Sequence, residues 1–191
     1  MRAGAAIALL GCLLVSCRAP WTIRPIDAAE QDPGSGQPFD AVHYAASIWE
    51  AKVIPAASRA PDFARVRSSS HPVLVKGTGR VVRIDSARQR ILLDIAPYDG
   101  KPDVALDTGQ VHGTALRDAL PFIQFSQFIN QVDFAHAANA LNDRAAAVGS
   151  AAMADVTIGS VLAFAGALDV SGGPGLAEIV PVSLSQEAGR P

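Results

Sequence analysis

Cysteine is almost absent from this sequence. The chain of 191 residues has two cysteines, Cys12 and Cys17, and both lie near its amino terminus. A folded domain in the rest of the chain has no disulfide, free thiol or thiolate ligand, so its core alone must hold it together. The four histidines are scattered, with no pair at metal-binding spacing. The sequence therefore predicts neither a metal site nor a cofactor.

An excess of charge of either sign is lacking as well. The chain carries 18 acidic and 16 basic residues, which gives a formal net charge of -2. This balance offers no electrostatic reason to expect a nucleic-acid partner. Catalytic motifs are also missing, because there is no Gly-X-Ser-X-Gly elbow and the segment from Lys76 to Gly79 lacks the spacing of a Walker loop. We expect no enzyme, and a hydrolase is the least supported function.

A hydrophobic run long enough to cross a membrane, about 20 residues, is missing too. Instead Arg2 precedes a short apolar run over residues 3–15, and small or apolar residues lead directly to Cys17. This arrangement is typical of a secretory signal peptide. We predict that residues 1–16 are removed and that Cys17 becomes the lipidated first residue, which anchors a periplasmic protein to a bacterial membrane. Two alternatives stay open: cleavage by an ordinary signal peptidase near Ser16, and lipid attachment at Cys12.

The next segments are predicted to be a tether and a helix. Residues 17–38 contain prolines and glycines without a regular pattern, which indicates a flexible tether. A helix is predicted over residues 39–54, with Asp40 as its capping side chain and Phe39 packed on Tyr44. Pro55 is predicted to end this helix.

The remaining residues alternate between strand and helix patterns. Strands are predicted over residues 73–85, 90–95 and 103–106, with a bend or bulge in the first at Gly77 and Gly79. A long helix follows over residues 124–147 and ends at Gly149, and two strands over 156–170 and 178–184 flank a loop at 171–175. Three strands, a helix and two strands are the order of an OB-fold. We predict an α+β fold, an OB-like β-barrel over residues 72–184 preceded by the N-terminal helix, in a single globular domain over residues 39–191.

Aromatic residues are scarce, at 6% of the chain, yet four of them crowd into one segment. These are Phe122, Phe125, Phe128 and Phe134. We expect this segment to form the centre of the core.

The same segment holds the candidate binding residues. Arg117 and Asp118 are adjacent charges between apolar residues, and two interpretations stay open. In the first interpretation, the arginine caps carbonyl groups while the aspartate holds a loop. In the second, the guanidinium points into a cleft and binds a carboxylate, phosphate or sugar hydroxyl. Amides on the predicted helix either tie it to neighbouring backbone or line a small polar pocket. The candidate ligand or partner residues are Arg117, Asp118, Phe125, Asn130, Gln131 and Asn139.

Several of these motifs together resemble a known bacterial family. The motifs are Phe39-Asp40 with Tyr44, Trp49, Lys52 and Pro55; residues 77–81; residues 113–118; and residues 128–131 with 140–142. In combination they resemble the predicted periplasmic lipoproteins of unknown function, over nearly the whole mature chain. The resemblance implies an accessory role beside sugar importers of the ATP-driven class. It implies no catalytic residue.

Two functions are therefore expected from the sequence. The leading one is a membrane-anchored periplasmic accessory or solute-binding component of a sugar importer, with importer subunits or a small polar solute such as a sugar as partners. The alternative is a structural or protein-interaction module of the cell envelope without a small-molecule ligand. Arg18, which follows the lipidated cysteine, is not the aspartate that retains some lipoproteins in the inner membrane. This favours delivery to the outer membrane.

Overall fold

We describe residues 38–66, 69–170 and 175–187 of a computed structural model of the chain. The predicted signal peptide, the lipid-attachment site Cys17, the tether up to residue 37 and most of the loop predicted at 171–175 lie outside the described residues. Among the described residues, no helix is both long enough and apolar enough to span a membrane.

The N-terminal helix begins as predicted but does not end at Pro55. It consists of α1 (Ala41–Ile48), a π-helical turn η1 (Trp49–Val53) and α2 (Ile54–Ser58). The backbone N–H of His43 donates to Asp40 Oδ1 at 2.9 Å, which confirms the predicted cap. The prediction of an end at Pro55 was wrong, because Pro55 stands in the first turn of α2, where a missing N–H is tolerated.

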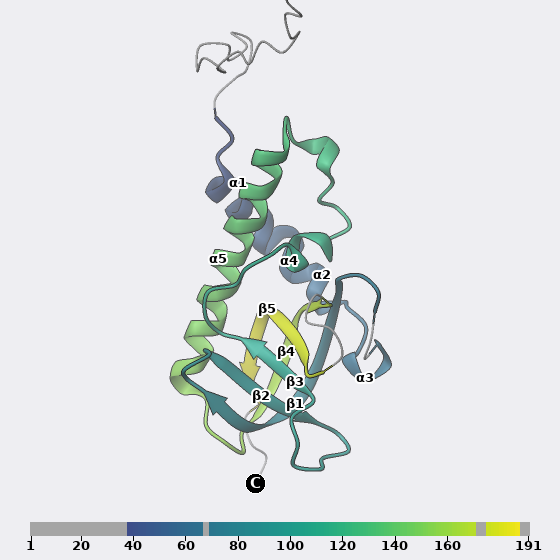
Figure 1. The fold of residues 1–191 in the computed structure, drawn as a ribbon, viewed down its shortest axis with the longest axis vertical. Helices are drawn as coiled ribbons and strands as arrows, with labels where there is room; N and C mark the ends of the chain where they lie inside the picture. Colours follow the sequence, from purple (N-terminus) through teal and green to yellow (C-terminus); the bar gives the residue numbers. More distant parts are fainter. Residues whose placement is uncertain (1–37, 67–68, 171–174, 188–191) are drawn as a thin grey trace, which may run out of the picture. The chain divides into compact units, whose positions relative to one another are not determined.

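Five strands form a closed barrel in the order β1-β2-β3-β5-β4 (Figure 1). They are β1 (Val73–Asp85), β2 (Arg90–Ile95), β3 (Val104–Asp107), β4 (Val161–Asp169) and β5 (Ala177–Gln186). All neighbouring pairs are antiparallel except β3 and β5, whose parallel pairing closes the barrel. Among the described residues the helix α5 (Gln131–Asp155) comes between β3 and β4, so the predicted OB-like barrel with an N-terminal helix is confirmed.

β1 pairs with both β2 and β4, and its irregularity is not where the sequence indicates. The register with β2 shifts between Val81 and Arg83, beyond the predicted positions Gly77 and Gly79. Gly79 is required for close packing instead, because a Cβ there would lie 2.7 Å from Ile95 Cδ1. The predicted start of the fourth strand at residue 156 was also wrong, since residues 156–160 form a turn before β4 begins.

The long helix starts later and continues further than predicted. The short helix α4 (Ala115–Asp118) is followed by a 3-10 turn η2 (Phe125–Gln127), and α5 begins only after Asn130. The Asn130 side chain accepts the N–H of Asp133 at 2.8 Å and caps α5. At its other end α5 passes through Gly149 rather than ending there. A Cβ at Gly149 would lie 2.5 Å from Thr108 Cα, so this glycine lets α5 pack directly against the end of β3.

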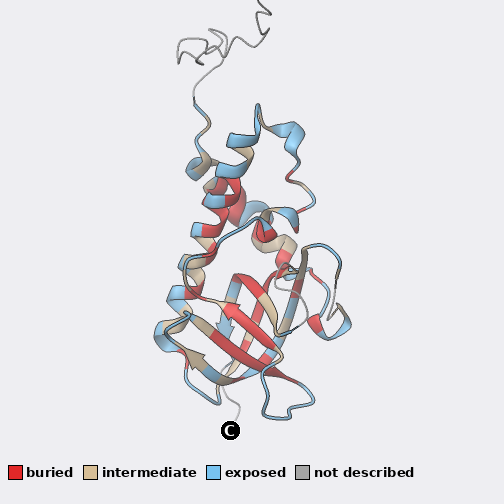
Figure 2. Ribbon diagram, viewed as in Figure 1, coloured by how far each residue is buried: buried red, intermediate tan, exposed pale blue. Residues whose placement is uncertain are grey.

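Two apolar cores lie next to each other (Figure 2). One fills the barrel interior, with Val81, Leu93 and Ile179 fully buried, and also includes Phe63 of the short helix α3 (Phe63–Val66). The other joins α1, α2, α4 and α5 to the outside of the barrel. The phenylalanines expected at the core centre lie at the edge of this second cluster, and Phe125 is 49% exposed. That expectation was wrong, because alanine, leucine and valine fill the narrow space between helix and barrel.

Candidate functional site

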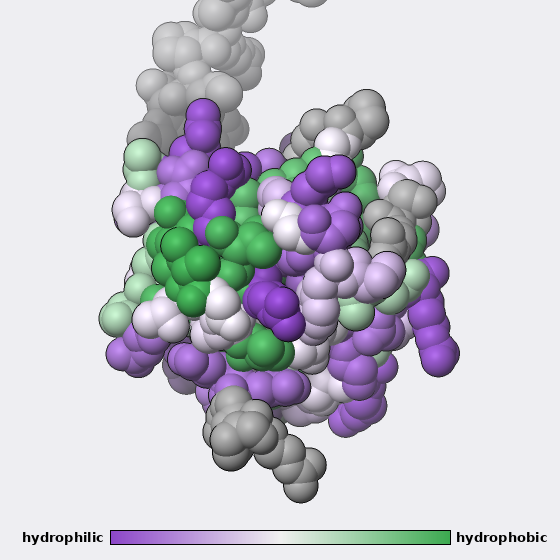
Figure 3. Space-filling model, turned by 90° about the horizontal axis from the view of Figure 1, so that it is seen from below, coloured by the Kyte–Doolittle hydropathy of each residue, from purple (hydrophilic) through white to green (hydrophobic). Residues whose placement is uncertain are grey.

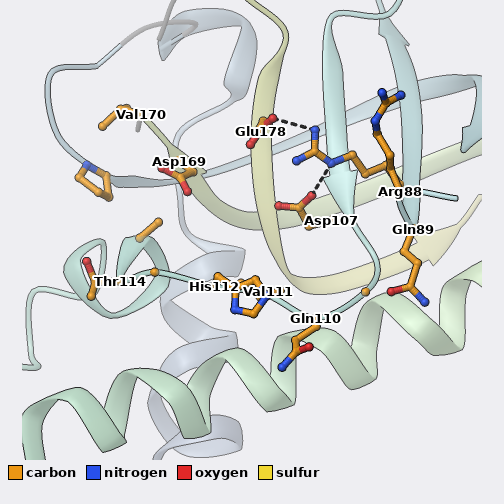
Figure 4. A pocket seen from close by; sticks show the side chains of 15 residues that line it. Arg88, Gln89, Asp107, Gln110, Val111, His112, Thr114, Asp169, Val170 and Glu178 are labelled. Atoms are coloured by element: carbon orange, nitrogen blue, oxygen red, sulfur yellow. Dashed lines mark hydrogen bonds and ion pairs between the residues drawn. The ribbon is translucent and has the colours of Figure 1, made fainter. Parts of the chain in front are cut away.

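A cavity of about 710 Å³ opens on the outer face of the barrel, beside the seam where β3 pairs with β5. It is lined by the last residues of β3 and β4, the first residues of β2 and β5, and the segment that follows β3 (Figure 4). Its polar lining residues are Arg88, Gln89, Arg90, Asp107, Gln110, His112, Thr114, Asp169 and Glu178. In OB-folds, ligands bind near the loops that join strands 1 and 2 and strands 4 and 5. The cavity includes residues 88–89 of the first connection and residue 170 of the second.

Arg90 is held between two carboxylates of the cavity wall. Its Nε lies 2.9 Å from Asp107 Oδ1, and its Nη1 donates to Glu178 Oε1 at 2.8 Å. Arg90 begins β2, Asp107 ends β3, and Glu178 lies near the start of β5, so the two ion pairs connect three strands where the barrel closes. The three side chains are between 23% and 29% exposed. They are thus reachable from the cavity but fixed by each other.

The electrostatic environment affects Asp107 and Arg90 differently. Burial raises the pKa of Asp107 above its ordinary value. The charge of Arg90 lowers this pKa, whereas the charges of Glu178 and Asp169 raise it further, and the net shift is upward. Burial alone would lower the pKa of Arg90, but Asp107 and Glu178 together raise it. Arg90 is therefore a permanent cation, and Asp107 is an acid whose ionised form is less favoured than in water.

The opposite wall of the cavity is a backbone segment that α5 holds in place. After β3 the chain runs through residues 108–114 toward α4. Ser150 Oγ donates to the carbonyl of Thr108 at 3.1 Å, and Asn142 Nδ2 donates to the carbonyl of Gly113 at 2.9 Å. Asn142 is 3% exposed, so an amide of the long helix does tie it to neighbouring backbone. Three side chains of this segment, Gln110, His112 and Thr114, are exposed and line the cavity.

The cavity presents both hydrogen-bond donors and acceptors. Guanidinium and amide groups donate, carboxylate and amide oxygens accept, and the threonine hydroxyl does both. Arg88 contributes an exposed cation, because its side chain is 76% exposed and forms an ion pair with Asp85 at 3.2 Å. Among the residues that the structure describes, no three histidines, cysteines or carboxylates are grouped so that they could hold a metal ion. The arrangement suits a ligand that donates and accepts hydrogen bonds.

The residues predicted from sequence lie apart from this cavity, around the ring of Phe134. The guanidinium of Arg117 stacks on that ring at 3.7 Å from its centroid, and its Nη1 donates to the Phe134 carbonyl at 3.3 Å. Arg117 Nε also donates to Asp118 Oδ1 at 2.8 Å, while Thr114 Oγ1 donates to Asp118 Oδ2 at 2.6 Å. These contacts match the interpretation in which the arginine caps a carbonyl and the aspartate holds a loop. A ligand-binding role for the pair stays a prediction.

The other predicted residues are only partly brought together. Phe125 packs against Phe134 with ring centroids 5.5 Å apart, and thus lies near Arg117. Asn130 caps α5. Gln131 and Asn139 are exposed on α5, so the structure does not join them into one polar pocket.

Sequence reasoning missed the ion-paired residues of the cavity. Arg90, Asp107 and Glu178 are charged residues at strand ends, scattered over nearly ninety positions of the chain. The available signal was the predicted strand order itself, because an OB-fold barrel brings these strand ends together. Charged residues at the ends of the predicted strands identify the site once the topology is assumed.

Comparison with solved structures supports the fold. An OB-fold protein from Thermotoga maritima MSB8 is similar, with a TM-score of 0.63 and 16% sequence identity. The alignment covers 79% of this chain and 100% of that chain. At this identity the likeness shows the fold alone. A comparison with curated proteins finds no significant match.

Comparison with protein families identifies the chain more closely. The family described as "Predicted periplasmic lipoprotein (DUF2291)" matches residues 6–72 and 66–185. These two matches include the predicted signal and tether as well as the helices and the barrel. The chain therefore belongs to this family of periplasmic, membrane-anchored lipoproteins of unknown function.

Proposed function

We propose that this lipoprotein binds a small, neutral, polyhydroxylated solute such as a sugar in the cavity beside the β3–β5 seam, as an accessory or solute-binding component of an ATP-driven sugar importer. The observation that carries the binding proposal is the polar cavity itself, whose wall holds Arg90 between Asp107 and Glu178. The importer association follows the resemblance of the sequence motifs.

The charges of the cavity favour a neutral ligand. Two arginines face three carboxylates, so neither an anion nor a cation is strongly attracted. A sugar hydroxyl donates one hydrogen bond and accepts others, which this mixture of donors and acceptors satisfies. The size is also suitable, because small-molecule cavities have volumes of about 300–1,000 Å³.

Binding is a better explanation of the carboxylates than hydrolysis. The same guanidinium pairs with Asp107 and with Glu178, at 2.9 and 2.8 Å. A hydrolase needs one carboxyl free to act on water or on the leaving group. A pair fixed on one arginine is better suited to orienting hydroxyl groups.

A thermal-shift screen of neutral sugars, charged sugars and nucleosides tests this proposal. A ligand at 100 times its Kd stabilises the folded state by about 2.7 kcal/mol, so a neutral sugar should raise the melting temperature. His112→Ala should reduce that shift because His112 lines the cavity, whereas His43→Ala, a matched change of an exposed histidine on α1, should leave it unchanged. If no compound stabilises the protein, direct solute binding is wrong.

The second candidate function is an interaction module of the envelope, and one observation favours it. Large apolar side chains are exposed at one end of the helical region, among them Ile129 at 79%. Crosslinking in intact cells tests the importer association. The proposal expects importer subunits to be captured, and capture of other envelope proteins alone would support the module instead.

A further inference from the structure

The N-terminal end of α5 and the turn before it form the end of the helical region that is distant from the barrel, and this end is exposed (Figures 1 and 2). It carries three exposed apolar residues. Phe125 is 49% exposed, Ile129 is 79% exposed, and Val132 is 59% exposed. They come from η2, from the segment after it and from the first turn of α5. We call these three residues the apolar tip.

The apolar tip rests on a built aromatic support. Phe125 and Phe128 both contact Phe134, with ring centroids 5.5 and 5.2 Å apart. Arg117 covers the same ring at 3.7 Å from its centroid. η2 is closed by a reciprocal capping box in which the backbone N–H of Gln124 donates to Gln127 Oε1 at 2.9 Å and the Gln124 side chain accepts the backbone N–H of Gln127. The exposed side chains are therefore held outward by ordered structure.

The segment that carries the apolar tip is free of charge. Residues 119–132 contain no aspartate, glutamate, lysine or arginine, although such residues make up 18% of the chain. Its exposed polar groups are amides and hydroxyls, including Gln124, Ser126 and Gln131. Moving this segment into a membrane interface removes apolar area from water and desolvates no charged residue of residues 119–132.

The anchored end of the chain joins the domain beside this surface. Phe39, the first residue after the tether, contacts Phe128 with ring centroids 5.4 Å apart and Tyr44 at 5.5 Å. The lipoprotein family assignment places the membrane anchor on the N-terminal side of Phe39. The apolar tip is thus next to the point where the chain comes from the membrane.

We propose that the apolar tip inserts into the interface of the same bilayer that holds the lipid anchor, with the lipid surface as its partner. One attachment point lets a tethered domain rotate, whereas a second contact sets its orientation. The barrel then points away from the membrane. The 25 residues of α5 span about 37 Å, which separates the barrel end from the bilayer by roughly that distance.

The barrel surface on the side opposite the apolar tip also exposes apolar residues (Figure 3). A position on that side is therefore a matched control for membrane contact at the tip. Ile158 follows the C-terminal end of α5 and is 68% exposed, close to the value for Ile129 before its N-terminal end. Hydrophobic exposure alone would give both isoleucines the same membrane contact. The proposal differs, because it places only Ile129 in the bilayer.

Site-directed fluorescence on the lipidated protein tests the proposal. The mature chain has no cysteine other than the acylated Cys17, so Ile129→Cys and Ile158→Cys each introduce one reactive thiol for an environment-sensitive NBD label. Each labelled lipoprotein is reconstituted into vesicles of phosphatidylethanolamine and phosphatidylglycerol. We expect blue-shifted emission at position 129, quenching by doxyl-labelled lipids several-fold stronger than at position 158, and protection from iodide at position 129 alone.

Each other outcome overturns the proposal. Equal quenching at both positions would mean that the anchor brings the whole domain near lipid without a preferred orientation. No lipid quenching at either position would mean that the tip faces water. If the label at position 129 is protected from iodide in native membranes but is not quenched by doxyl-labelled lipids in vesicles, the apolar tip contacts a protein partner instead of lipid. Both positions are exposed, so the labels leave the core intact.

Discussion

Gly149→Ala is predicted to destabilise the protein although it replaces a glycine within a helix by the best helix former. An added Cβ would lie 2.5 Å from Thr108 Cα and 2.9 Å from the carbonyl oxygen of Asp107. Both are main-chain atoms, so no change of side-chain rotamer relieves the contact. Overpacking costs about 1–3 kcal/mol and the gain in helix propensity is about 1 kcal/mol, so we expect a net loss of up to about 2 kcal/mol in the free energy of unfolding.

Urea denaturation followed by circular dichroism measures this loss. Ala151→Gly, at an exposed position two residues further along α5, is the matched control and should cost about 1 kcal/mol through helix propensity alone. Both changes should therefore lower stability, for opposite reasons. If Gly149→Ala stabilises the protein while the control destabilises it, the close packing of α5 on the end of β3 is refuted.

Three further predictions concern the cavity wall and the first helix. Asn142→Ala should lower the free energy of unfolding by about 0.5–1.5 kcal/mol in urea denaturation, since it removes the hydrogen bond from a buried amide to the Gly113 carbonyl; an unchanged midpoint would contradict this. Folding raises the pKa of Asp107, so the contribution of this carboxyl to stability is present below the ordinary pKa of 3.8 and is lost as pH rises through the raised pKa. The free energy of unfolding of the wild type, relative to that of Asp107→Asn, should therefore fall with rising pH; a relative stability that rises with pH would contradict this. Asp40→Ala should lower the melting temperature through a loss of about 0.5–2 kcal/mol of capping, and an unaltered melting curve would argue against the cap.

The strands could be predicted well because each carries its own local signal. The predicted bounds of the first two strands, residues 73–85 and 90–95, agree with β1 and β2. Val, Ile and Leu dominate both, and a short polar turn separates them. The positions of the glycines in β1 were also informative, but their role is close packing rather than a bulge: Gly77 lies against Phe164 of β4, and Gly79 lies against Leu93 and Ile95 of β2.

The helix could be located but not delimited. The absence of proline and glycine after residue 123 suggested a start at 124, whereas Asn130 supplies the cap and α5 begins at Gln131. Gly149 was interpreted as a stop because the contact that requires it, with Thr108, comes from a distant part of the chain. Local sequence cannot distinguish a glycine that ends a helix from one that lets another backbone approach.

The cavity was the part least accessible to sequence reasoning. Arg90, Asp107 and Glu178 become one cluster only through the closure of the barrel by β3 and β5. The predicted candidates around Arg117 drew attention because they are adjacent in sequence, and adjacent charges stand out without any fold. In the structure Arg117 and Asp118 contact each other and their neighbours Thr114 and Phe134.

Backbone NMR during a titration with neutral sugars is the most direct test of solute binding in the cavity beside the β3–β5 seam. The account predicts that amide shifts change over residues 88–90 and 107–115 and at Glu178, and that residues 125–132 stay unaffected. Changes centred on Arg117 and Gln131 would instead place the ligand at the residues predicted from sequence. No change with any sugar would contradict the central claim.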